Sequence, residues 1–113
     1  MFKVLALEEW PEGLGKPLVL IRQSPAELER QFSINFQPHP EDPEFIRAVL
    51  IEAHGRHFGL MDLKHALQPG TEVWVHHGVH DLEQAIRDVQ SLLRLRNGDV
   101  LWTAMATSAV AHA

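Results

Sequence analysis

The sequence predicts an α+β fold, in which a mainly antiparallel sheet of about six or seven short strands is covered on one face by one long amphipathic helix. Short apolar runs that alternate with polar residues recur along the chain, separated by turn-forming Pro and Gly, as in antiparallel strands. One stretch, at about residues 81–96, instead repeats its apolar residues every three or four positions, and a short helix is expected near 24–31. These patterns predict a single globular domain over residues 1–113, with 107–113 as a frayed tail.

The first elements predicted are two strands and a short helix. Phe2–Leu7 indicates the first strand, and a turn-rich loop follows it. Leu18–Ile21 is a run of β-formers that is typical of a buried second strand. Ser24 is then a good helix N-cap, because Pro25 suits the first helical position and Glu27 completes a capping box.

The middle of the chain predicts a third strand, a loop and a segment with two interpretations. Phe32–Phe36 alternates apolar and polar residues, which favours a strand with one solvated side, and the proline-rich stretch 37–43 is a loop. A helix over 43–54 is one interpretation of the next segment, because Asp and Pro start it well and a Gly follows it. Its β-branched residues favour the other: one helical turn near Pro43, then a hairpin that pairs Arg47–His54 with His57–Leu63.

The last third predicts a strand, the main helix and a final strand. Glu72–His76 is the strand, Asp81 caps the helix with Gln84 in the capping-box position, and Asn97-Gly98 ends it. Asp99–Met105 is the last strand, and the two strands that flank the helix are expected to be parallel or separated by another strand. The apolar face of the helix consists of Leu82, Ala85, Ile86, Val89, Leu92 and Leu93.

Composition narrows the classes of partner and compartment. The net charge of −5, with histidines neutral, argues against nucleic acid as a partner, because phosphate binding favours a basic surface. The absence of cysteine excludes disulfides and thiolate metal sites and suits a reducing cytoplasm. No apolar run approaches the roughly 20 residues that span a bilayer, and the first residues lack the features of a signal peptide. A cytoplasmic protein without membrane association is therefore expected.

Three histidines fall between the predicted strand and the main helix, and they are the clearest candidates for chemistry. Neutral imidazole is the commonest side-chain metal ligand, so His76, His77 and His80 are candidate ligands for zinc or another divalent metal. Within a strand His76 and His77 would face opposite sides, but Gly78 allows a sharp turn that folds His80 back toward them. The spacing matches no specific zinc motif, so surface or turn histidines are the plainer interpretation.

A second pair of histidines lies in the predicted hairpin. His54 and His57 flank Gly55-Arg56, which suits a type II′ turn, and would then sit opposite each other. Side chains opposite each other across two strands have Cβ atoms roughly 5 Å apart, which permits joint metal ligation. His54 and His57 therefore join the candidate ligands.

No catalytic residues or cofactor motif are found, and the sequence predicts a non-enzymatic protein-interaction module: an inhibitor, an immunity-type protein or a regulatory factor. The expected partner is another protein or a second copy that pairs through an open sheet edge. Trp10, His39 and Phe45, around the proline-rich loop, are the expected contact residues. Trp10, Trp74 and Trp102 are expected to anchor the core or loops rather than to form a base-stacking platform. The alternative is a histidine-rich divalent-metal-binding protein or a metal-dependent enzyme that activates water.

Overall fold

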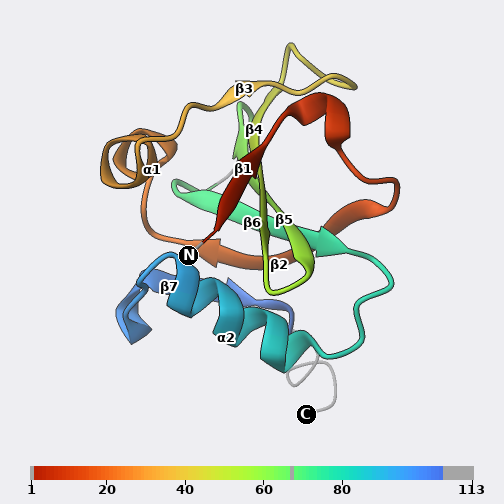
Figure 1. Cartoon of the computed structure of the whole chain (residues 1–113). Helices are drawn as coiled ribbons and strands as arrows, with labels where there is room; N and C mark the ends of the chain where they lie inside the picture. Colours follow the sequence, from red (N-terminus) through yellow and green to blue (C-terminus); the bar gives the residue numbers. More distant parts are fainter. Residues whose placement is uncertain (1, 67, 106–113) are drawn as a thin grey trace.

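The computed structural model describes residues 2–66 and 68–105, and this part of the chain forms an α+β fold with a seven-stranded antiparallel sheet and two α-helices (Figure 1). Two turns of 3₁₀ helix, η1 and η2, lie between these elements. In chain order the elements are β1 (Lys3–Leu5), η1 (Leu7–Glu9), β2 (Leu14–Ile21), α1 (Pro25–Phe32), β3 (Gln37–Pro38), β4 (Ile46–Ala53), β5 (Arg56–Leu63), β6 (Thr71–His76), α2 (Leu82–Leu92), η2 (Asn97–Asp99) and β7 (Val100–Thr103).

The strand order is β1-β4-β5-β6-β2-β7, and β3 pairs with β4 outside this path. In Figure 1 the β4–β5 hairpin crosses β6 and β2 at a steep angle, so the sheet is strongly twisted. The strands that flank α2, which are β6 and β7, share the sheet and are separated by β2. This is one of the two arrangements that the sequence predicts.

The hairpin interpretation of residues 43–63 is confirmed, with a different turn. Ile46 donates its amide to the Asp42 carbonyl at 2.9 Å, which closes the single turn expected near Pro43. The closing pair of the hairpin is Ala53 with Arg56, so the two-residue loop consists of the residues between them, His54 and Gly55. Both have positive φ, at 54° and 75°, as a type I′ turn requires. The type II′ turn predicted at Gly55-Arg56 is therefore wrong.

The short helix α1 begins as predicted, but the strand expected after it does not form. The Ser24 hydroxyl accepts from the Glu27 amide, and the Glu27 carboxylate accepts from the Ser24 amide, each at 3.2 Å. The helix continues to Phe32 and ends at Ser33, which has φ 55°.

The segment after α1 buries Ile34 and Phe36, and side chains rather than a neighbouring strand bind the backbone of Phe36. Glu29 accepts the Phe36 amide at 2.9 Å, and Arg47 donates to the Phe36 carbonyl at 2.7 Å. Only Gln37–Pro38 pairs with β4, which is why alternation over 32–36 does not become a strand.

The main helix, α2, spans Leu82–Leu92 and is shorter than the predicted 81–96, and Asn97-Gly98 does not end it. Asp81 caps it by accepting the Gln84 amide at 3.1 Å, but the Gln84 side chain bonds Asp88 and completes no capping box. The helix ends at Leu92, because Arg94 adopts φ 54° and directs the chain away. The amides of Arg94 and Leu95 donate to Ser91 and Gln90, which is a Schellman motif with Arg in the position that usually holds Gly.

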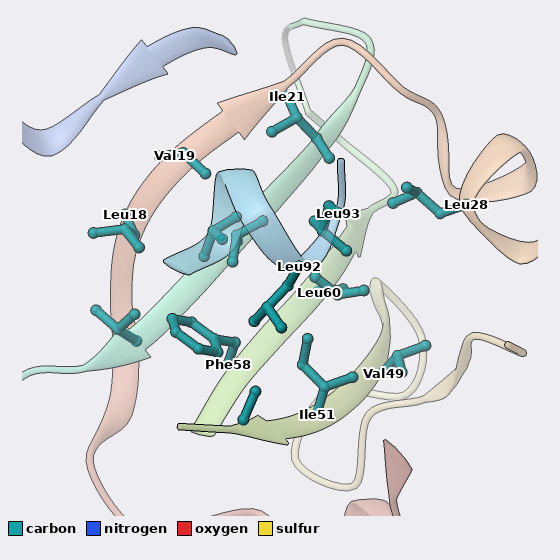
Figure 2. Close-up of a cluster of buried hydrophobic side chains, with 14 of the residues drawn as sticks. Leu18, Val19, Ile21, Leu28, Val49, Ile51, Phe58, Leu60, Leu92 and Leu93 are labelled. Carbon is teal, nitrogen blue, oxygen red and sulfur yellow. The ribbon is translucent and has the colours of Figure 1, made fainter. Parts of the chain in front are cut away.

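Two apolar clusters lie on opposite faces of the sheet, because alternate residues of β4 belong to different clusters. The larger cluster fills the space between the sheet and the helices, where Figure 2 shows Phe58, Ile51 and Leu60 facing Leu92 and Leu93. The smaller cluster includes Leu50 and Met61. The four β4 residues 48–51 are all buried, which explains why this run fits a helix and a strand equally well.

In the described residues, no helix has the length and apolar character to span a membrane.

Candidate functional site

The histidine pair at the end of β6 has a defined geometry. The chain leaves the strand at His77, whose amide donates to the Gly13 carbonyl at 2.9 Å. The two rings therefore do not face opposite sides, as predicted for a continuous strand. Instead the rings of His76 and His77 stack, with centroids 4.8 Å apart and planes inclined by 25°.

Backbone partners fix the proton positions on both rings when these are neutral. His77 Nδ1 lies 3.0 Å from the Gly13 carbonyl oxygen, which can only accept, so this nitrogen carries the proton. His76 Nδ1 accepts from the Gly78 amide at 3.0 Å, so the proton of His76 lies on Nε2. Both rings therefore keep Nε2 for other partners, and in the neutral form this nitrogen can donate in His76 and accept in His77.

Gly13 is needed beside this pair for two reasons. Its φ of +85° lies in the left-handed region that favours glycine. A Cβ at this position would also lie 2.7 Å from His76 Nε2 and 2.7 Å from His77 Cε1. Any side chain here would displace both rings.

His57 is the third histidine at this end of the sheet. Phe58 pairs with Val75, so the next register position brings His57 opposite His76. Both histidines line one open pocket of about 330 Å³. His57 Nε2 lies 3.3 Å from a carboxylate oxygen of Glu52, its partner on β4. Together, His57, His76 and His77 make up the histidine cluster.

His54 and His80 lie apart from the histidine cluster. His54 occupies the hairpin loop, so it does not sit opposite His57 as predicted, and it lines a different pocket together with Phe2 and Arg94. His80 is exposed in the segment that leads to α2. The predicted set of five ligands is therefore divided over separate surfaces.

The histidine cluster is poorly arranged for metal ligation. Lone pairs lie in the plane of each imidazole ring, so two nearly parallel stacked rings do not aim them at one point. A zinc ion requires its ligand nitrogens at about 2.0–2.1 Å from a common centre. Across residues 2–66 and 68–105, no three His, Asp or Glu side chains form a group that could hold a metal ion.

Two of the three predicted contact residues support the fold. Trp10 covers Gly59, its Nε1 donates to the Leu14 carbonyl at 3.2 Å, and its ring makes an edge contact with His39 at 4.6 Å between centroids. His39 is only 5% exposed, and its Nδ1 accepts the Glu41 amide at 3.1 Å.

The third predicted contact residue, Phe45, is at the surface. Phe45 is 40% exposed and rests against His65, with ring centroids 5.0 Å apart. Of the predicted contact residues, it is therefore the one most accessible to a partner.

A pocket of about 670 Å³ is lined by the β1–η1 segment, by residues of the 33–40 segment, and by Ala48 and Val49 of β4. Its lining, all within the described part of the chain, includes one ionisable residue, Glu8. General acid–base catalysis uses titratable groups in reach of each other, so this pocket offers no such pair.

An ion pair anchors the start of β7. Asp99 is buried, and its carboxylate accepts the Arg96 amide at 2.9 Å and the Arg22 guanidinium at 2.6 Å. These bonds stabilise the charged form, with the backbone bond contributing most, and lower the pKa of Asp99 from 3.8 to about 2. The pair holds the end of β2 to the beginning of β7.

Large apolar side chains are exposed on β7 and just after it. Leu101 is 50% exposed, Trp102 36% and Met105 43%. We call these three residues the β7 surface. Trp102 was expected to anchor the core or a loop, and its exposure corrects that expectation. The sequence predicts the strand itself, but local patterns do not reveal which strand lies at an edge of the sheet.

Comparisons of the chain with protein-family models, with curated proteins and with solved structures found no match.

Proposed function

We propose that this protein is a non-enzymatic interaction module that binds a protein partner through the β7 surface. The observation that carries the proposal is the exposure of Leu101 and Trp102 on a strand that ends the sheet order, with exposed Met105 two residues after the strand. Aromatic and methionine side chains are enriched where proteins bind each other, and exposed apolar groups on a sheet edge favour strand pairing.

The chemistry of the other surfaces supports a binding role over a catalytic one. The stacked rings of the histidine cluster serve as partners of backbone groups in a turn, and the 670 Å³ pocket offers a single ionisable group. An inhibitor, an immunity-type protein or a regulatory factor in the cytoplasm are the forms that such a module takes under this proposal.

The test compares two exposed apolar residues on strands at opposite ends of the sheet order. Leu101→Lys places a charge on the β7 surface, and Val4→Lys places one on β1, where Val4 has the same 50% exposure. Immobilised natural chain and the Val4 variant should retain the same proteins from a cell extract, and Leu101→Lys should lose them. Equal retention by all three chains would contradict the proposal.

Divalent-metal binding is the second candidate, and the histidine cluster is the observation that favours it. His57 and His76 share a pocket, and His77 stacks on His76. Rotation of one ring would be needed before two nitrogens could approach one ion. A rise of the melting temperature on adding zinc, lost in His76→Ala but kept in the exposed His80→Ala, would support this role, and no rise would remove it.

A further inference from the structure

We infer that the partner of the β7 surface is a second copy of this chain, bound by antiparallel pairing of β7 with β7 about a two-fold axis. This inference rests on the proposed function, because it uses the same surface. It adds the identity of the partner and the geometry of the contact.

The position of β7 permits this pairing. One side of the strand pairs with β2, where Leu20 faces Trp102 and Ile21 faces Val100. This register leaves Leu101 with no residue opposite it on β2, in a bulge. The strand ends the sheet order, and no other strand among residues 2–66 and 68–105 pairs with it. A second β7 would therefore extend the sheet from this end.

The charge pattern of β7 favours self-pairing in particular. At a two-fold interface the same patch contacts itself, so a charged residue near the axis meets an identical charge. The strand consists of Val100, Leu101, Trp102 and Thr103, and it contains no charged residue and no proline. Self-pairing of this strand therefore brings no like charges together.

The two charged side chains at the start of β7 neutralise each other. Arg22 and Asp99 lie at the start of the strand and bind each other, with Nη2 2.6 Å from Oδ1. Neither charge is left to repel its copy across the axis. The exposed apolar area of Leu101 and Trp102 then gains from burial against the second copy.

Cysteine cross-linking tests the geometry, because the chain contains no cysteine and an introduced thiol is the only one. A disulfide forms only where the two Cα atoms come within about 4.4–6.8 Å. Leu101→Cys or Trp102→Cys should give a covalent dimer under mild oxidation. Val4→Cys, at the same 50% exposure as Leu101, is the matched control and should remain a monomer. Equal cross-linking of Val4→Cys, or none at 101 and 102, would overturn the inference.

Light scattering tests the association without a cross-link. The natural chain should approach twice the 12.8 kDa of one chain as its concentration rises from about 10 µM to 1 mM, and Leu101→Lys should stay at 12.8 kDa with an unchanged circular dichroism spectrum. If Leu101→Lys does not fold, the cysteine variants still decide.

A monomeric natural chain would overturn the inference. If Leu101→Lys nevertheless lost a different protein partner, the proposed function would stand and the second copy alone would be excluded.

Discussion

The two ends of the sheet are built in opposite ways. At one end, β1 and β3 both pair with β4, and they carry a charged residue, Lys3, and a residue without an amide proton, Pro38. At the other end, β7 carries neither in Val100–Thr103 and exposes Leu101 and Trp102. Charge and proline are the features by which sheet edges resist pairing with other chains. The β1 end therefore carries features that oppose pairing with another chain, and the β7 end lacks them, as the proposed contact requires.

The sharpest test of this difference compares two leucines at the two ends. Leu50 of β4 pairs with Leu5 of β1 and is fully buried, so Leu50→Ala should lower the free energy of unfolding by about 2–5 kcal/mol. Leu101→Ala should change it by no more than about 0.5 kcal/mol. Urea unfolding at about 1 µM, where association is minimal, measures both, and equal losses would abolish the contrast.

The second test is Gly59→Ala, which disturbs the packing of Trp10 on β5. A Cβ on Gly59 would lie 2.5 Å from Trp10 Cη2, and the Trp10 ring is already held by Leu14 and His39. Gly59→Ala should therefore cost about 1–3 kcal/mol and shift the near-ultraviolet circular dichroism of Trp. Gly15, where a Cβ meets nothing within 4 Å, provides the control substitution Gly15→Ala.

Acid should loosen the β7 end through Asp99. Its pKa is about 2 in the folded chain against an ordinary 3.8, so its charged form stabilises the fold above pH 3.8. This contribution is lost as the pH falls from about 4 to about 2. The melting temperature of the natural chain should fall more steeply in this window than that of Asp99→Asn, which is already less stable at neutral pH. Parallel curves would exclude the role of Asp99.

The smallest effect expected is a gain at the end of α2, between the two ends of the sheet. Arg94 has φ 54°, a conformation that costs a residue with a side chain about 1–2 kcal/mol and costs Gly nothing. Arg94→Gly should raise the stability by about 0.5–1 kcal/mol, after the greater flexibility of Gly in the unfolded chain is subtracted. Arg96→Gly, at φ −95°, is the control and should give no gain.

The fold class, the hairpin and the strand of Glu72–His76 were predictable, because periodicity and turn residues are local properties of the sequence. The end of α2 was not, because Arg94 rather than Gly98 takes the left-handed position. The strand predicted at Phe32–Phe36 is wrong because α1 continues to Phe32 and the side chains of Glu29 and Arg47 bind the backbone of Phe36. Local pattern cannot report such partners.

The candidate sites were less predictable than the fold. His57 meets His76 only through the register of β5 with β6, and the hairpin loop separates His54 from His57. The β7 surface depends on strand order. The sheet pairs β7 with β2, which is distant in the sequence, and leaves β7 at the end of the order. Register and strand order are long-range properties, and the local patterns of a single sequence do not reveal them.

Amide hydrogen exchange at low and high protein concentration tests the contrast between the two ends most directly, because it observes β1 and β7 in one sample. If β7 pairs with a second copy, amides of Val100–Thr103 exchange more slowly at about 1 mM than at about 10 µM, while those of Lys3–Leu5 exchange at the same rate at both concentrations. No change in β7, or an equal change in β1, would contradict it.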